Sequence, residues 1–313
     1  MAYGLEGRLV IGVASSALFD LTDSDEVFRT EGETRYRRFQ EEHLDDTLQP
    51  GVAFGFIKRL LALNDLTADD DPIVEVIILS RNDPETGLRV MRSVAAHGLD
   101  ISRAIFTQGR SPNAYIGALN MALFLSGSSQ DVRAAVDAGL PAGQVVGAVT
   151  QHAEGRELRI AFDFDGVLAD DTSERVMQAE GLDAFHAHER SNAGVPSAPG
   201  YLQRLLRELN RIQDLEDQRI SEDSTYERRV RVAIVTARSA PAHERVVQTL
   251  KAWNLRVNDA FFLGGIEKAR VLRELRPHIF FDDQMSHLES AALEIPSVHV
   301  PFGITNQADH PSK

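Results

Sequence analysis

Two aspartates that follow an apolar run in the second half of the chain could share one metal ion or one proton. Asp163 and Asp165 stand two residues apart after residues 160–162. Residues at this spacing project to the same side of a strand, and Gly166 permits the sharp turn that lets both carboxylates reach one ligand. Carboxylates this close repel each other, so we expect a divalent cation or a shared proton between them. A helix N-cap or a surface turn would use aspartate in the same way.

Three further segments supply side chains that would complete a site for phosphoryl transfer. Thr236 ends a second apolar run and could donate its hydroxyl to a phosphoryl oxygen, and Lys268, at the start of a predicted helix, could neutralise one. Asp282 and Asp283 follow a third apolar run, and adjacent acids at a strand end favour a hard metal ion bound through oxygen. Each of these residues alone could have a structural role. The prediction of a phosphoryl-transfer site therefore rests on all four segments occurring in this order.

These side chains can meet only if the segments are neighbouring strands. Short runs of β-branched residues alternate with amphipathic stretches such as residues 53–63 and 271–275, a pattern typical of strands and helices in turn. That alternation predicts an α/β fold with a parallel sheet. Ligands bind such sheets at the carboxyl ends of the strands, where three of the four segments carry their polar residues, and Lys268 lies at the start of a predicted helix.

The same α/β unit occurs twice in the sequence. Matching strand-end and turn residues are 29 positions apart in each half: Ser80 to Gly109 and Thr236 to Gly265. We therefore predict two similar Rossmann-like units, residues 1–150 and 151–313, joined near residues 150–157. Parallel strands resemble each other because they are all rich in Val and Ile, but that likeness does not explain the matched spacing.

The polar residues of the second copy are missing from the first. The alignment pairs four acids with other residues: Asp163 with Ala14, Asp165 with Ser16, Asp282 with Leu125 and Asp283 with Ser126. Residues 1–150 are therefore predicted to be a degenerate unit without catalytic acids, and chemistry is expected in the second copy only.

An insertion of about sixty residues, at about 170–229, separates the first two motifs of the active copy. We expect a mostly helical cap over the site, ended by a charged and mobile stretch from Gln213 to Arg229. Such an insertion closes over small substrates and excludes water. A small metabolite is therefore expected rather than a protein substrate.

The composition limits the partners. A net charge of −14 leaves no broad basic surface for a nucleic-acid polymer or an anionic membrane. The chain has no cysteine, which excludes disulfides and thiolate chemistry and fits a cytoplasmic location. The polar residues 1–8 and the brief apolar run 9–14 do not make a signal peptide or a membrane span.

The four motifs in this order resemble the haloacid-dehalogenase-like (HAD) superfamily of aspartate-nucleophile phosphatases over roughly residues 160–300. The resemblance implies a HAD-type parallel-sheet unit, an aspartyl-phosphate intermediate and Mg²⁺. The implied roles are Asp163 as nucleophile, Asp165 as general acid/base, Thr236 and Lys268 as phosphate binders, and Asp163, the backbone carbonyl of Asp165 and either Asp282 or Asp283 as metal ligands.

A closer resemblance, to the cytosolic class I 5'-nucleotidases, covers nearly the whole chain. The matching segments are residues 14–20, 79–84, 98–103, 173–175, 235–240 and 277–284, with Phe185, His188 and Glu189. This resemblance implies hydrolysis of nucleoside 5'-monophosphates, with Ala237 and Arg238 beside Thr236 and Lys268 at the substrate.

One departure from that family bears on the preferred substrate. The family usually has glycine between the two acids and alanine after the second, where this chain has Phe164 and Gly166. The chemistry is unaffected, but the choice among AMP, IMP, deoxynucleotides and pyrimidine nucleotides stays open.

Residues for recognition of the base are expected in the cap and in the first copy. Phe185 could stack on a base with His188 and Glu189 nearby, or be a core residue of the cap. Ser80, Arg81, Asn82 and Asp83 could also contact substrate if the first copy leans on the cleft, although Arg81 or Asp83 could instead only cap a helix.

Two other functions fit the same residues. One is a HAD-type phosphatase for another small ester, such as a sugar phosphate. The other is a nucleotide-binding regulatory protein whose hydrolysis is incidental. A homo-oligomer is compatible with the sequence.

Overall fold

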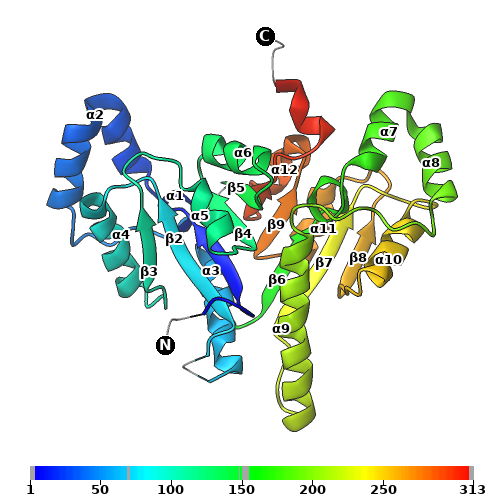
Figure 1. The fold of residues 1–313 in the computed structure, drawn as a ribbon, viewed down its shortest axis with the longest axis horizontal. Helices are drawn as coiled ribbons and strands as arrows, with labels where there is room; N and C mark the ends of the chain where they lie inside the picture. Colours follow the sequence, from blue (N-terminus) through cyan, green and yellow to red (C-terminus); the bar gives the residue numbers. More distant parts are fainter. Residues whose placement is uncertain (1–3, 69–70, 148, 150–154, 310–313) are drawn as a thin grey trace. The chain divides into compact units, whose positions relative to one another are not determined.

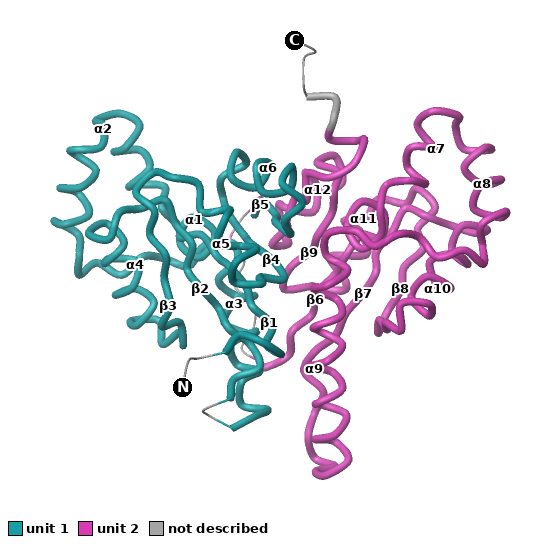
Figure 2. The backbone as a smooth tube through the Cα atoms, in the orientation of Figure 1, with its two compact units in different colours: residues 1–145 teal, residues 146–313 magenta. Residues whose placement is uncertain are grey.

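The computed structural model describes residues 4–68, 71–147, 149 and 155–309. The chain divides into two units, Met1–Val145 and Val146–Lys313 (Figure 2). Residues 150–154, part of the joint expected from the sequence, lie outside the described residues. Among the described residues, no helix has the length and apolar character needed to cross a membrane.

Unit 1 is a parallel sheet with strands in the order β3-β2-β1-β4-β5. The strands are β1 (Leu9–Val13), β2 (Val74–Ser80), β3 (Arg103–Phe106), β4 (Leu123–Ser126) and β5 (Ala142–Val146). The helices are α1 (Ser15–Leu18), α2 (Thr22–Glu42), α3 (Phe54–Leu61), η1 (Ala62–Leu66), α4 (Pro84–Ala96), α5 (Asn113–Ala118) and α6 (Ser129–Asp137) (Figure 1).

Unit 2 repeats this order as β8-β7-β6-β9-β10, again parallel. Its strands are β6 (Leu158–Phe162), β7 (Val230–Thr236), β8 (Asp259–Phe262), β9 (Ile279–Asp282) and β10 (Ser297–His299). Its helices are η2 (Phe164–Leu168), α7 (Thr172–Glu180), α8 (Leu182–Ser191), α9 (Gln203–Glu222), α10 (His243–Ala252), α11 (Lys268–Leu275), α12 (Met285–Ala291) and η3 (Ile304–Asp309). The α/β class with parallel strands, predicted from the sequence, is confirmed.

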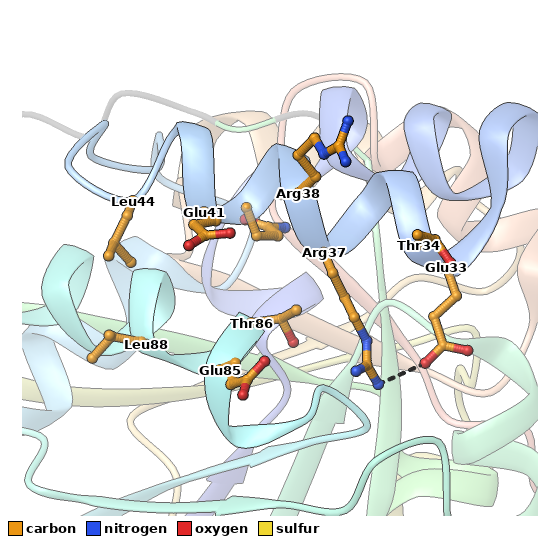
Figure 3. Close-up of a pocket in the computed structure, with 10 residues that line it drawn as sticks. Glu33, Thr34, Arg37, Arg38, Glu41, Leu44, Glu85, Thr86 and Leu88 are labelled. Atoms are coloured by element: carbon orange, nitrogen blue, oxygen red, sulfur yellow. Dashed lines mark hydrogen bonds and ion pairs between the residues drawn. The ribbon is translucent and has the colours of Figure 1, made fainter.

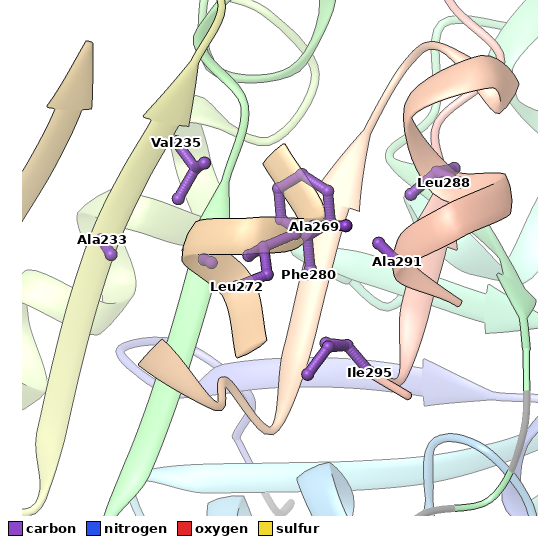
Figure 4. Packing of buried hydrophobic residues seen from close by; sticks show 9 residues of the cluster. Ala233, Val235, Ala269, Leu272, Phe280, Leu288, Ala291 and Ile295 are labelled. Atoms are coloured by element: carbon purple, nitrogen blue, oxygen red, sulfur yellow. The ribbon is translucent and has the colours of Figure 1, made fainter. Parts of the chain in front are cut away.

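The strands that hold the site are buried on both faces. Four of the five residues of β6 and all four of β9 are buried, as expected for central strands covered by helices. In unit 2, α11 and α12 pack Leu272 and Leu288 against Phe280 of β9 (Figure 4). This packing holds the start of α11 beside the end of β9, where the chemistry-bearing residues lie.

The register corrects the sequence alignment of the two copies by one residue. The backbone N–H of Ala14 donates to Leu125 O, and that of Asp163 donates to Phe281 O. Leu125 therefore corresponds to Phe281, and Ser126 rather than Leu125 corresponds to Asp282. The distance from the matched turn glycine to Leu125 in unit 1, and to Phe281 in unit 2, is then 16 residues.

The stretch from Gln213 to Arg229, expected as the mobile end of a cap, is helical over its first ten residues. Residues 213–222 continue α9, whose Leu205, Leu206 and Leu209 are fully buried. Glu216 accepts hydrogen bonds from the backbone N–H groups of Arg229 and Val230. The helix is amphipathic: one face of α9 packs on the sheet, and most of the charged residues lie on the other face, in solvent. Within residues 170–199, α7 and α8 pack against each other (Figure 1).

Candidate active site

Asp163 leaves the end of β6 and is buried at a sharp turn. It is 4% exposed, and its Oδ1 accepts a hydrogen bond from Phe164 N at 2.7 Å. Gly166 has φ of 70°, and a Cβ there would meet Asp283 Cγ at 2.6 Å. A side chain at 166 would therefore be excluded by both backbone conformation and space, which explains why glycine follows the second aspartate.

Lys268 joins two of the predicted acids. It is the first residue of α11, and its Nζ lies 2.7 Å from Asp163 Oδ2 and 2.7 Å from Asp282 Oδ2. All three side chains are nearly fully buried. Asp282 Oδ1 also accepts from Gln284 N at 2.8 Å and lies 3.2 Å from His287 Nδ1. The structure thus brings three separated motifs to one point, as the sequence predicted.

Burial and charge shift the pKa values of this cluster in opposite directions. Burial raises the pKa of Asp163 to about 6, although Lys268 opposes the shift. Burial, helped by the charges of Asp163 and Asp282, raises the pKa of Asp283 to about 9. Burial would lower the pKa of Lys268, but the two carboxylates beside it raise that pKa above its usual value. Burial would raise the pKa of Asp282, but Lys268 and His287 hold it below its usual value.

The cluster has the donors that a divalent cation needs. One ligand atom each from Asp163, Asp282 and His287 lies within 4.8 Å of the others. Within the part of the chain that the structure describes, Asp283 Oδ1 is buried without a hydrogen-bond partner. If all three acids beside the single buried lysine were ionised, the site would carry an excess of negative charge, which a cation would offset. The carboxylate oxygens suit a hard ion, and His287 can orient Asp282.

Thr236 ends β7, beside the strand that carries Asp163. The register pairs Phe162 of β6 with Ile234 of β7, so the two strands end at the same edge of the sheet. Thr236 is 1% exposed, and its Oγ1 accepts a hydrogen bond from Arg238 N at 3.2 Å. Because Thr236 Oγ1 accepts this bond, its hydroxyl hydrogen is available to donate to a ligand. The next residue, Ala237, is exposed.

Arg238 holds both carboxylate oxygens of Asp165. The distances are 2.6 Å from Nε to Oδ2 and 2.6 Å from Nη2 to Oδ1. Arg238 is itself buried, pairs with Glu189, and lies 5.6 Å from the ring centroid of Phe185. Burial would lower the pKa of Arg238, but the two carboxylates raise it above its usual value. A paired fork of this kind fixes the orientation of Asp165.

Glu189 ties α8 to the rest of unit 2. It is 0% exposed, and its Oε1 accepts from Ser173 Oγ and from Arg245 Nη1, each at 2.8 Å, while Oε2 accepts from Arg238. His188 Nε2 lies 3.3 Å from the same Arg245 Nη1. Both oxygens of Glu189 are therefore engaged inside the protein.

Comparison with known proteins decides the family. The model of the 5'-nucleotidase family matches residues 1–307. The chain belongs to the 5'-nucleotidase family. It is 34% identical over 292 residues to human cytosolic 5'-nucleotidase 1B, a match that covers 91% of this chain and 47% of that protein. The chain thus spans about half the length of this curated relative. No solved structure matches it significantly.

Other predicted residues of this 5'-nucleotidase-family chain lie at the end of β2 in unit 1. Ser80 Oγ is 3.0 Å from Ser15 Oγ and accepts from Asn82 N at 3.2 Å. Asp83 caps α4 by accepting from Thr86 N at 2.9 Å. Asp83 therefore has the helix-capping role that the sequence left as the alternative.

Sequence reasoning missed two residues of this 5'-nucleotidase-family site. Arg245 anchors Glu189, and His287 contacts Asp282. An arginine on the otherwise buried face of α10, beside Val246 and Thr249, is the one signal that could have found the first. His287 follows Asp282 by five residues, but no spacing rule for strand-to-helix turns would single it out.

Proposed function

We propose that this protein hydrolyses nucleoside 5'-monophosphates to nucleoside and inorganic phosphate, with Asp163 as nucleophile. The observation that carries the proposal is Lys268 Nζ, 2.7 Å from both Asp163 and Asp282 in a chain of the 5'-nucleotidase family. The name of the human relative agrees with this activity and with a cytoplasmic location. A nucleoside monophosphate would be the partner, and a homo-oligomer is compatible with the proposal.

In the first step, a carboxylate oxygen of Asp163 attacks phosphorus, and the bond from phosphorus to the 5' oxygen breaks. Lys268 and the hydroxyl of Thr236 hold phosphoryl oxygens and offset their charge. Asp165 gives its proton to the leaving 5' oxygen, which becomes the hydroxyl of the nucleoside. Asp165 then takes a proton from the water that cleaves the aspartyl phosphate. Phosphate leaves, and the carboxylate of Asp163 is restored.

Asp165 can carry a proton only if Arg238 releases one of its oxygens. Both oxygens accept hydrogen bonds from this arginine in the structure. We propose that substrate binding opens one of these two bonds. Glu189 would act as a positioning residue for Arg238 rather than as a contact to the base, since its carboxylate is fully buried and engaged.

Mg²⁺ is the proposed cofactor. Asp163, the backbone carbonyl of Asp165 and Asp282 would hold it, with the unpartnered oxygen of Asp283 as the alternative acidic ligand. When bound, the ion would offset the charge that the acids and the phosphate bring together.

The proposed architecture is two HAD-type units, residues 1–150 degenerate and residues 151–313 active. The α7–α8 hairpin would serve as the cap over the site. This cap would be shorter than the one expected at 170–229, because α9 packs against the sheet. Phe185 on α8 would stack on the base, and His188 would lie near it.

A substrate panel with matched variants tests the function. Phosphate release is measured with Mg²⁺ for purine and pyrimidine nucleoside monophosphates, deoxynucleotides and sugar phosphates. Nucleotides should be the faster substrates, and Asp163→Asn should abolish release. The control is Asp214→Asn, which removes an exposed carboxylate paired with Arg256. Sugar phosphates outpacing every nucleotide, or turnover that survives Asp163→Asn, would refute the proposal.

A further inference from the structure

Unit 1 has a kinked helical arm, α2, that corresponds to the arm formed by α7 and α8 in unit 2. Helix α2 is interrupted at Gly32 (φ 81°, ψ 178°), and Gly181 between α7 and α8 has nearly the same angles (φ 84°, ψ −178°). Each arm lies between the two residues of an equivalent antiparallel bridge, Phe19 with Pro50 and Ala169 with Pro199. The first copy has therefore kept the arm as well as the sheet.

The anchor of the arm is also kept. In unit 1, Arg89 donates from Nη1 to Gln40 Oε1 at 3.2 Å and from Nε to Asp46 O at 3.0 Å. In unit 2, Arg245 donates from Nη1 to Glu189 Oε1 at 2.8 Å and from Nε to Val195 O at 2.9 Å. Gln40 and Glu189 both lie eight residues after the kink glycine, and each arginine lies nine residues after its strand-end hydroxyl residue.

The groups that would handle phosphate and metal are replaced in unit 1. Ala14 stands for Asp163, Ser16 for Asp165 and Ser126 for Asp282, and the helix that begins with Lys268 in unit 2 begins with Asn113 in unit 1. The scaffold of a binding cleft is thus present without the charges that hold a phosphate.

A pocket of about 500 Å³ lies under this arm, at the carboxyl ends of β2 and β3. Phe28 and Tyr36 of α2 line it, in edge-to-face contact with ring centroids 5.6 Å apart, and Phe28 is 52% exposed. Tyr36 lies four residues after the kink glycine, as Phe185 does in unit 2. Asn82 and Gln108 add amide groups, with Asn82 Oδ1 at 3.5 Å from the Tyr36 hydroxyl.

The charge of the pocket disfavours a phosphate. Among its described lining residues, the single arginine is Arg81, which is paired with Asp131. Asp25, Glu33 and Asp83 bring carboxylates, and Arg37, outside this lining, pairs with Glu33 and Asp83. No unpaired cation is thus left among the described lining residues for a phosphate. An aromatic pair, amides and carboxylates suit a ligand with a flat ring and hydroxyl groups but no negative charge.

A neighbouring hollow of about 770 Å³ lies between α2 and α4 (Figure 3). Charged residues of both signs line it, with Arg37 bonded to Glu33. Its described lining offers no aromatic ring for a base to stack on. The smaller pocket, with Phe28 and Tyr36, is therefore the better fit for a ring.

We propose that unit 1 carries a second ligand site, in the pocket under α2, that binds an uncharged nucleoside. The ligand class rests on the proposed function, because a nucleoside is the product of that reaction. The site would let the protein sense the product apart from the catalytic cleft.

The test uses the full-length Asp163→Asn chain with Mg²⁺, which should bind nucleotide without consuming it. Calorimetric titration with AMP should show one site per chain, and adenosine added at saturating AMP should then fill one further site. Phe28→Ala should weaken this second binding about tenfold, as expected when a stacking aromatic is removed. The control Tyr115→Ala, which removes another exposed aromatic of unit 1, should leave it unchanged.

Three outcomes would overturn the site: no adenosine binding at saturating AMP, adenosine binding unaltered by Phe28→Ala, or two AMP molecules per chain. Phosphate release by the chain with native Asp163 is measured beside these titrations. Release from AMP without a second adenosine site would refute the site alone, whereas a second site without release from any nucleotide would refute the proposed function alone.

Discussion

Units 1 and 2 differ where the chemistry would be and agree almost everywhere else. Both have the same strand order, the same kinked arm and the same arginine anchor. They diverge at the strand ends, where Asp163 and Asp282 in unit 2 correspond to Ala14 and Ser126 in unit 1. On the proposed function, the difference teaches that a few residues at strand ends would separate a reactive site from a scaffold without its charges.

The largest expected effect comes from copying the residue of unit 1 into unit 2. Asp163→Ala should lower the rate of phosphate release by about a thousandfold or more, as removal of a nucleophile does. Ser16→Ala in unit 1 should leave the rate unchanged. Steady-state phosphate release with Mg²⁺ measures both variants. A similar loss in both would show that unit 1 takes part in the chemistry.

The second effect concerns the buried lysine. Lys268→Met leaves two buried carboxylates without their shared cation, so the free energy of unfolding should fall by about 3–5 kcal/mol. Asn113 is the first residue of the equivalent helix in unit 1, and Asn113→Ala removes a long hydrogen bond to Asp131 O, so it should cost about 1 kcal/mol or less. Urea unfolding of both variants checks the contrast. Equal losses of unfolding free energy would contradict the view that buried charges stabilise only the site in unit 2.

Removing the arginine that anchors the arm should also destabilise unit 2 more than unit 1. Arg245→Met leaves the buried Glu189 carboxylate without one of its two arginines, and we expect a loss of about 3 kcal/mol. Arg89→Met leaves the neutral amide of Gln40 short of a hydrogen bond, and should cost about 1–2 kcal/mol. Thermal unfolding compares the two variants. A larger loss for Arg89→Met would reverse the account.

The smallest contrast is between the two kink glycines, which should behave alike. A Cβ at Gly32 or at Gly181 meets nothing within 4 Å, so only the backbone conformation opposes alanine. That conformation is nearly confined to glycine, and each substitution should cost about 1–3 kcal/mol. Unfolding curves of Gly32→Ala and Gly181→Ala that differ clearly would break the correspondence of the arms.

The sequence predicted the parts of the site whose positions follow from the strands. Asp163 and Asp282 come directly after buried apolar runs, so their place at one edge of a parallel sheet follows from the alternation of strands and helices. Lys268 was predicted from its place at a helix start after two glycines. The structure joins all three by hydrogen bonds and ion pairs.

The sequence could not predict contacts made between distant helices. Arg245 and Glu189 are 56 residues apart, and which face of α8 turns inward depends on tertiary packing. The one-residue error in aligning Asp282 arose because apolar strands tolerate a shift that only the backbone register resolves. The charged end of α9 was taken for a mobile stretch because its buried residues include Gln213 and Glu216, whose polar groups bond to backbone.

The central claim is that the side chain of Asp163 becomes phosphorylated during turnover. The chain is mixed with AMP carrying labelled phosphate and with Mg²⁺, quenched in acid within the first turnover, and digested for mass spectrometry. The account predicts the mass of one phosphoryl group on the peptide that contains Asp163, with label from AMP. Label on another residue, or phosphate release at full rate with no labelled peptide, would contradict it.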